Sequence, residues 1–283
     1  MTARRLCAVL TAGFLTAGVV AGSAATPVAG ATTTSEAGAT TASESRRTVA
    51  APPRLGPADT LHIQFAGRLD TKVAARVYEL DGQNSTVSTI RALHRKGRKV
   101  VCYLSAGSVE AYRPDAHSFP PAVVGKTLDG WPDERWLDVR QTGVLLPIMA
   151  RRVAACAAKG FDAVEFDNVD GYANDTGFPL TRTQQVRYDR ALADLAHRHR
   201  MAAVLKNAPD LVPSLVRSFD AALVEQCAQY DECAAWRPFV TARKAVWDLE
   251  YRVPYARACA AGRAARIQVQ LKRLSLDAYR RAC

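Results

Sequence analysis

The chain has 283 residues, 48% of them hydrophobic, and a formal net charge of +11. Its lysines and arginines are scattered and accompany no nucleic-acid-binding motif, so the charge favours a solvated basic surface over a nucleic-acid-binding protein. Binding of an anionic polymer is the alternative explanation of this charge. No fixed-period repeat is present, which argues against a solenoid.

The first 25 residues have the order of a secretory signal peptide. Arg4 and Arg5 precede an apolar run over residues 6–20, and small residues follow at 23–25. The run is short for a membrane span, a retained anchor is the alternative, and no later stretch is long enough to cross a bilayer. We therefore expect cleavage after residue 25, a secreted, extracellular protein, and no membrane association once the peptide is removed.

Residues 26–56 are rich in Ala, Thr, Ser and Gly and contain no aromatic residue. Such a segment buries too little surface to offset its ordering entropy, and it predicts a disordered linker. Residues 57–283 suit one large α/β domain.

In this domain, short strand-like runs alternate with helical stretches, which indicates parallel strands joined by crossover helices. Eight strands are predicted, over residues 61–65, 76–80, 99–105, 161–167, 202–206, 221–225, 245–249 and 267–270. Eight such units in this length fit a single (β/α)8 TIM barrel. A doubly wound open sheet is the rival, but the Gly-rich phosphate loop that it needs after an early strand is missing.

Three helices are predicted, over residues 86–96, 147–159 and 181–200. The second begins at Pro147, because the first turn of a helix tolerates proline, and it ends before Gly160. The segment 107–146 is predicted to be a long loop, and a loop of this length in a compact domain is usually functional.

Acidic residues gather at the ends of the fourth and sixth strands. Strand alternation places Ala163, Glu165 and Asp167 on one face, which points into the lumen of a barrel. Asp167 then stands at the carboxyl-terminal mouth, and Glu225 ends the sixth strand at the same mouth. Glycoside hydrolysis needs two such carboxylates, one at the anomeric carbon and one that protonates the leaving oxygen.

These acids also have alternative roles. A single strand-end acid more often caps a helix or pairs with an arginine. Glu165, Asp167, Asp170 and Glu225 at one mouth would repel each other, which favours a function that uses them. Binding of a divalent cation is the alternative use.

The chain resembles glycoside hydrolase family 114, the endo-α-1,4-polygalactosaminidase family, over nearly all of this domain. The matching stretches are residues 63–65, 101–108, 113–116, 130–140, 159–172, 176–180, 205–207, 225–227, 232–233 and 250–251. The resemblance implies a glycosidase that cleaves α-1,4-linked galactosamine or N-acetylgalactosamine polysaccharide. It also implies a retaining mechanism in which Asp167 is the nucleophile and Glu225 the general acid/base.

Some positions depart from the family's pattern. Ala208 and Val224 stand where the family often has Asp and Asn, and His62 lies in a zone where Trp is common. These departures motivate one alternative, a non-catalytic glycan-binding barrel, and the basic charge motivates another, a polyanion-binding surface protein. We expect a polysaccharide partner, no cofactor or metal, no nucleic-acid partner, and a monomer.

A group of residues at strand ends and on loops near the mouth is predicted to bind substrate, with bracing of the barrel or of a loop as the alternative role for each. These residues are Gln64, Asp81, Tyr103, Trp131, Glu165, Asp170, Tyr172, Lys206 and Glu250. Lys206 would also offset the charge of the acids around it. Asp138 and Arg140 are predicted to form a local ion pair.

Six cysteines follow the signal peptide, and an even number in an exported chain predicts three disulfides, although about 15 pairings are possible. Cys102 has the opposite parity to Tyr103 and faces the helix layer, which favours a bridge to Cys156. A bridge between Cys227 and Cys233 would stiffen the loop after Glu225. Cys259 and Cys283 remain as the third pair.

Overall fold

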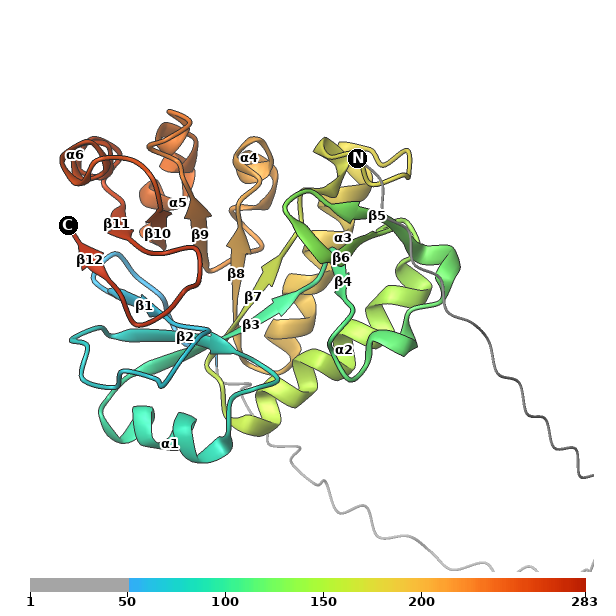
Figure 1. Cartoon of the computed structure of the whole chain (residues 1–283), viewed down its shortest axis with the longest axis horizontal. Helices are drawn as coiled ribbons and strands as arrows, with labels where there is room; N and C mark the ends of the chain where they lie inside the picture. The colour runs from blue at the N-terminus through green and yellow to red at the C-terminus, as the bar shows by residue number, and fades with distance from the viewer. Residues whose placement is uncertain (1–50) are drawn as a thin grey trace, which may run out of the picture. The chain divides into compact units, whose positions relative to one another are not determined.

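The computed structural model describes residues 51–283 (Figure 1). The predicted signal peptide and most of the predicted linker lie outside this range. Leu55, which the sequence assigned to the linker, is 1% exposed, and its carbonyl accepts a 3.1 Å hydrogen bond from Ala245 N. The packed domain therefore includes this residue.

Eight parallel strands form the main sheet, and all eight predicted strands are confirmed to within two residues at each end. In sheet order they are β1 (Leu61–Ile63), β2 (Val77–Asp81), β3 (Lys99–Ser105), β7 (Ala163–Asp167), β8 (Ala202–Lys206), β9 (Ala221–Glu225), β10 (Ala245–Glu250) and β11 (Gln268–Leu271). A short strand, β12 (Arg281–Ala282), pairs antiparallel with β11. The sheet curls into the expected TIM-barrel-like α/β fold (Figure 1).

The C-terminal segment joins the two sides of the curled sheet. Phe65 N and Ala66 N donate to Leu276 O at 2.9 and 3.3 Å, and Arg280 Nε donates to Leu61 O at 3.1 Å. These contacts satisfy backbone groups along β1, the first strand of the sheet. The barrel is thus completed by the chain that follows β11.

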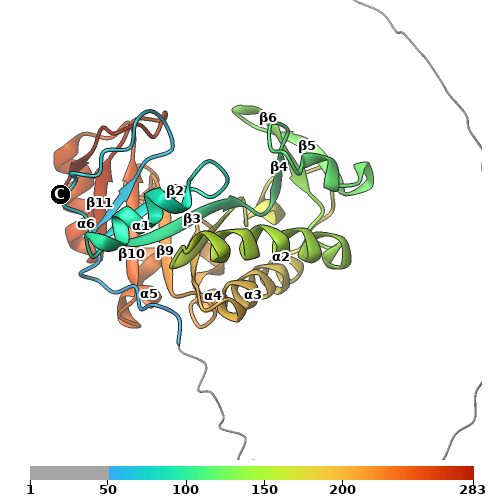
Figure 2. The ribbon, with the colours of Figure 1, turned by 90° about the horizontal axis from the view of Figure 1, so that it is seen from below.

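Helices cover the outer face of the sheet (Figure 2). They are α1 (Val87–Arg95), α2 (Thr142–Lys159), α3 (Arg182–Arg198), α4 (Val212–Leu215), α5 (Arg237–Thr241) and α6 (Tyr255–Ala265). Within the described chain, the connection between β1 and β2 contains no helix. None of the helices between residues 51 and 283 is long and apolar enough to cross a bilayer.

The start predicted for the second helix is wrong, because α2 begins five residues earlier and contains Pro147. A proline close to a helix start costs only one hydrogen bond to the preceding turn. Leu145, on that preceding turn, is fully buried in the core, and its burial stabilises the extra turn. The start of α3 follows the sequence, since Thr181 and Gln184 form a capping box.

The segment 107–146 is not the long loop that was predicted. It contains an antiparallel sheet of β4 (Ser108–Glu110), β5 (Val124–Leu128) and β6 (Trp131–Leu137). Gly130, at φ +78°, makes the tight turn between β5 and β6. Figure 2 shows this small sheet standing to one side of the parallel strands.

Strand alternation sorts the core into a lumen side and a helix side. Small and branched residues such as Ala163, Val204 and Leu223 fill the floor of the lumen, with Trp247 among them. The neighbours of these residues in sequence pack against the helices. Charged side chains of the lumen face therefore lie at the carboxyl ends of the strands, above an apolar floor.

Three disulfides join Cys102 to Cys156, Cys227 to Cys233 and Cys259 to Cys283. These are the three pairings expected from the sequence. The first ties β3 to α2, the second closes the loop after β9, and the third ties α6 to the C-terminal residue.

Candidate active site

A pocket of about 960 Å³ opens at the carboxyl ends of the strands. The ends of β2, β3, β7, β8 and β9 form its floor, and residues of the small sheet form one wall. Asp167 and Glu225 both line it, and their side chains are 17% and 26% exposed. The pocket therefore brings together, within reach of a ligand, the two acids that strand geometry selected.

A buried lysine lies between these acids. Lys206 Nζ is 3.3 Å from Asp167 Oδ2, 3.7 Å from Glu225 Oε2 and 3.2 Å from Glu165 Oε1. Burial lowers the pKa of Lys206, but the charges of Asp167, Glu165 and Glu225 outweigh burial and hold this pKa well above its ordinary value. Lys206 is thus a fixed cation, as the sequence suggested.

The shared lysine also limits the separation of the two acids. The two contacted carboxylate oxygens can lie no farther apart than the two lysine distances added together. This limit includes the separation of about 5–5.5 Å typical of retaining glycosidases and reaches only the low end of the range of about 6.5–9.5 Å for inverting ones.

Glu225 is held on two sides. Its backbone N–H donates to Asn207 Oδ1 at 2.9 Å, and the Tyr251 hydroxyl donates to its carboxylate. Asn207 has a left-handed backbone, at φ +48°, which an asparagine tolerates better than most residues. Tyr251 was not among the predicted site residues, although it lies in the matching stretch 250–251.

A second carboxyl pair lies below the lysine. Glu79 and Glu165 are both fully buried, and within residues 51–283 no group donates a hydrogen bond to either carboxylate oxygen of Glu79. Burial, and then the negative charge of Glu165, raises the pKa of Glu79 well above its ordinary value and favours its protonated form. A protonated Glu79 could donate to Glu165 from beneath. The sequence prediction missed Glu79, although it shares the lumen parity of Val77 and Asp81.

One wall of the pocket is acidic. Arg113 pairs with Glu110 and with Asp81, each at 2.7 Å, and so neutralises part of this wall. Glu134 and Asp170 line the pocket without an ion pair among the described residues. Burial, with the charges of Glu110 and Asp167, raises the pKa of Glu134 to about 7, and burial with Asp167 raises that of Asp170 to about 6. A cationic ligand would favour the ionised form of both acids, so this wall suits such a ligand.

Two exposed aromatic rings stand over the pocket. Trp131 is 56% exposed and Tyr112 is 62% exposed, and both line the pocket. Exposed rings of this kind can stack on the apolar faces of sugars. Trp131 was predicted, whereas Tyr112 gave no signal in the sequence because its position depends on the fold of the small sheet.

Of the residues predicted to bind substrate, five line the pocket together with the acids. These five are Asp81, Tyr103, Trp131, Asp170 and Lys206. Glu165 lies beneath the pocket floor and is fully buried. The Gln64 amide instead braces the loop after β1, since it donates to Ala66 O and Arg68 O at 2.9 Å.

Two residues predicted to bind substrate do not line the pocket. Tyr172 lies outside the pocket lining, and its hydroxyl donates to Asp210. Glu250 is fully buried on the helix side of β10, where its carboxylate accepts from Ala228 N at 2.6 Å and from Gln229 N at 3.3 Å. Both faces of a barrel strand are buried, so composition did not reveal which face of β10 is the lumen.

The departures from the family's pattern lie away from the pocket lining. Val224 faces the helix layer, and Ala208 is 2% exposed in the outer core. The non-catalytic alternative therefore loses the observation that motivated it.

The predicted ion pair between Asp138 and Arg140 is confirmed, at 2.7 Å.

The arrangement of the acids disfavours a metal. The ammonium of Lys206 occupies the position among Glu165, Asp167 and Glu225 that a divalent cation would take. Elsewhere in residues 51–283, Cys227, Cys233 and Asp248 have ligand-type atoms within 4.8 Å of one another. Their two sulfurs are bonded to each other, which leaves one carboxylate.

Comparison with known proteins adds to this geometry. The model of glycoside-hydrolase family GH114 matches residues 38–283. The structure of Aspergillus fumigatus Ega3 in complex with galactosamine is 35% identical, with a TM-score of 0.79, over 83% of this chain and 99% of that chain. The glycoside hydrolase domain of PelA from Pseudomonas aeruginosa is similar in fold, at 14% identity and a TM-score of 0.60, over 77% and 96%. No curated protein matches the chain.

Proposed function

The chain belongs to glycoside-hydrolase family GH114 and is a glycosidase, and from this premise we propose that it hydrolyses galactosamine-containing polysaccharide with Asp167 and Glu225. The observation that carries the proposal is that both acids contact one buried lysine at the mouth of the sugar-sized pocket. Two carboxylates so placed supply the chemistry that glycosidic cleavage needs.

The proposed mechanism is retaining. Asp167 attacks the anomeric carbon, while Glu225 protonates the leaving oxygen, and a covalent glycosyl-enzyme forms. Glu225 then takes a proton from water, which attacks the same carbon and releases Asp167. The upper limit on the separation of the two acids supports this over inversion. The hydroxyl of Tyr251 orients Glu225 toward the leaving oxygen.

The proposed substrate is an α-1,4-linked polymer of galactosamine or N-acetylgalactosamine. The galactosamine bound to Ega3 supports the sugar, and the acidic wall supports a free amino group. Removal of Arg4 and Arg5 with the signal peptide lowers the net charge from +11 to +9, which would still repel a cationic polymer at long range. Above the raised pKa values of Asp170, about 6, and of Glu134, about 7, these two pocket acids are ionised and provide a local negative field that opposes this repulsion.

Location and assembly are also proposals. We infer that the enzyme acts outside the cell as a monomer, because the N-terminal sequence has the order of a secretory signal and three disulfides staple the domain. Residues 1–25 would be removed on export, and residues 26–56 would lead into the barrel.

The function is tested with Asp167→Asn and Glu225→Gln variants on a galactosaminogalactan-type polymer. Each is expected to lower kcat by about 1,000-fold or more, because each removes a group that acts in the transition state. Asp175→Asn, which changes an exposed rim acid paired with Lys126, is the control. Release of reducing ends by either catalytic variant at the wild-type rate would contradict the assignment.

The stereochemistry is a separate measurement. Proton NMR of the first products is expected to show the α-anomer before mutarotation sets in. A β-anomer as first product would leave the hydrolase in place but replace the nucleophilic role of Asp167 with that of a general base.

A further inference from the structure

Two buried carboxyls lie behind the pocket on strand β10. Asp248 and Glu250 are both 0% exposed, and their neighbours Trp247 and Leu249 fill the lumen. Alternation therefore turns both acids toward the helix layer, away from the pocket. Buried carboxylates are costly unless they are paired or hydrogen-bonded, so this pair needs an explanation.

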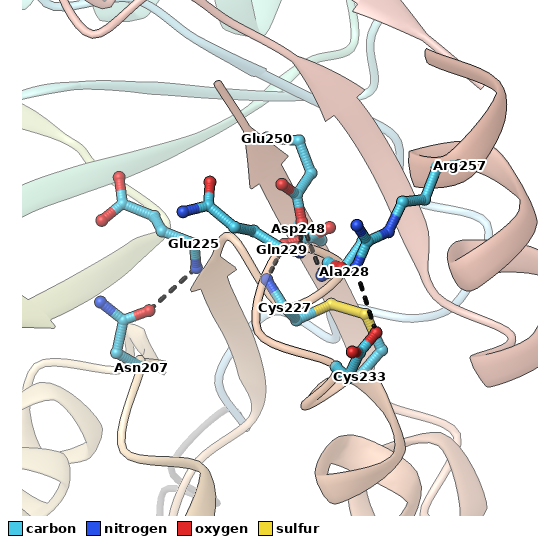
Figure 3. Close-up of a disulfide and its surroundings, with 10 residues drawn as sticks. Asn207, Glu225, Cys227, Ala228, Gln229, Cys233, Asp248, Glu250 and Arg257 are labelled. Carbon is cyan, nitrogen blue, oxygen red and sulfur yellow. Dashed lines mark hydrogen bonds and ion pairs between the residues drawn. A yellow bond between two sulfur atoms is a disulfide. The ribbon is translucent and has the colours of Figure 1, made fainter. Parts of the chain in front are cut away.

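The pair binds the backbone of the loop that follows Glu225 (Figure 3). Asp248 Oδ1 accepts from Cys227 N at 3.2 Å, and Glu250 Oε1 accepts from Ala228 N at 2.6 Å and from Gln229 N at 3.3 Å. Three consecutive backbone N–H groups of the loop thus donate hydrogen bonds to two neighbouring carboxylates of strand β10.

The pair is placed to share a proton. Within residues 51–283, no group donates a hydrogen bond to the buried Asp248 Oδ2 or Glu250 Oε2, and a proton on one carboxyl would let it hydrogen-bond to the other. Burial, and then the charge of Glu250, raises the pKa of Asp248 to about 8. Asp248 is therefore the donor, and the pair carries one negative charge, which the three N–H groups solvate.

Two short connections lead from this pair to Glu225. Gln226, between Glu225 and the anchored loop, donates its N–H to Leu249 O at 2.8 Å. On the other side, Tyr251 directly follows Glu250 and donates its hydroxyl to the Glu225 carboxylate. A shift of the end of β10 or of the loop would therefore move the proposed general acid.

We propose that Asp248 and Glu250 are positioning residues for Glu225, which share one buried proton and together anchor the loop after it. The inference rests on the catalytic role proposed for Glu225. When the shared proton is lost in alkaline solution, two adjacent buried carboxylates repel each other and release the loop. Activity then falls although Asp167, Glu225 and Lys206 are unchanged.

The other charged groups near the pair do not replace the proton. The guanidinium of Arg257, on α6, donates hydrogen bonds to Ala228 O at 3.0 Å and to the carboxylate of Asp231, in the loop, at 3.3 Å. Glu225 of β9 adds negative charge, which favours the protonated form of Asp248. Cys227 and Cys233 are joined in a disulfide and do not titrate.

The test compares Asp248→Asn and Asp248→Ala with Asp231→Asn, an exposed acid of the same loop, as the matched control. An asparagine keeps the acceptor for Cys227 N and donates permanently to Glu250, so it reproduces the protonated pair. An alanine removes both contacts. For each protein, kcat and KM on the galactosamine polymer are measured from pH 6 to 10, and amide hydrogen exchange of residues 226–232 is measured at each pH.

Asp248→Ala is expected to lower kcat about 10- to 100-fold at pH 7, with KM changed less than about twofold, because Glu225 is misplaced. Its loop amides should exchange faster than those of the control. Asp248→Asn should restore kcat and move the alkaline fall in activity upward by about one pH unit or more. If Asp248→Ala does not fold, the shift in Asp248→Asn decides the proposal.

Wild-type kcat and loop exchange in Asp248→Ala would overturn the proposal, as would an unchanged alkaline fall in Asp248→Asn. If the wild-type enzyme does not cleave the polymer, the proposed substrate fails, and hydrogen exchange alone decides the anchoring. Faster exchange of residues 226–232 in Asp248→Ala than in the control would then support it, and equal exchange would overturn it.

Discussion

Two groups of acids, one on each face of the barrel wall, place carboxylates close together, and their mutual repulsion is relieved in different ways. At the mouth, Glu165, Asp167 and Glu225 surround the ammonium of Lys206, and two of these acids reach solvent. Behind it, Asp248 and Glu250 are fully buried and share a proton. The ammonium of Lys206 keeps the mouth carboxylates ionised, so that they can act in catalysis. The proton on the buried pair instead removes one negative charge and leaves a hydrogen-bonded anchor for the loop.

Removal of the cation is expected to have the largest effect. Lys206→Met leaves three carboxylates near each other without a counter-charge, and we expect a loss of about 3–5 kcal/mol in the free energy of unfolding. Activity should fall by at least about 100-fold. Urea denaturation at pH 7 measures the first effect. Lys126→Met, at an exposed ion pair of the pocket rim, is the control and should change stability little.

A substitution that makes the shared proton permanent should remove the pH dependence of the buried pair. The folded-state pKa of Asp248 is raised from 3.8 to about 8, so the unfolded chain releases this proton first as pH rises. The contribution to stability is full below about pH 4 and is lost between there and about pH 8, by up to about 1.4 kcal/mol per pH unit. Asp248→Asn should flatten this slope and be more stable than wild type at pH 8. If the free energy of unfolding of the variant fell with pH as steeply as that of the wild type, Asp248 would not be the group that holds the proton.

The disulfide and the carboxyl pair both hold the loop after Glu225, and removal of the disulfide separates their effects. The Cys227–Cys233 bridge closes a loop with a sequence separation of 6, for which chain entropy predicts about 2 kcal/mol. The double Cys227→Ser, Cys233→Ser variant should lose about that much in thermal unfolding. Most of its kcat should remain, because the backbone N–H groups stay bound to Asp248 and Glu250. A loss of kcat as large as in Asp248→Ala would assign the anchoring to the disulfide.

The smallest effect is expected at a third kind of carboxylate site, which is partly open to solvent. His197 Nε2 lies 2.7 Å from Asp220 Oδ2, and this hydrogen bond raises the pKa of His197 above 6.5. The stability that it contributes is full below pH 6.5 and is lost as pH rises through the folded-state pKa. His197→Gln should cost up to about 1 kcal/mol at pH 5.5 and less at pH 8. Equal costs at both pH values would show that charge does not matter there.

Much of the site followed from strand parity. Alternation in residues 163–167 and the acid at the end of residues 221–225 were enough to predict that Asp167 and Glu225 meet at one mouth. The same rule did not orient β10, where Trp247 and Asp248 each fit a buried face. It also missed the small sheet in residues 107–146, because its strands are partly exposed and carry few apolar residues.

The sequence by itself predicted the eight parallel strands, a set of three disulfide pairings and two acids at one mouth, because strand runs, side-chain alternation and the parity of a cysteine can be followed along the chain. Only the tertiary structure decided that Lys206 lies between the acids, that Glu79 supports them from below, and that Glu250 faces away from the pocket. The physical reason is that a side chain's charge and role depend on neighbours that are distant in sequence. Burial and counter-charge exist only once the strands are assembled.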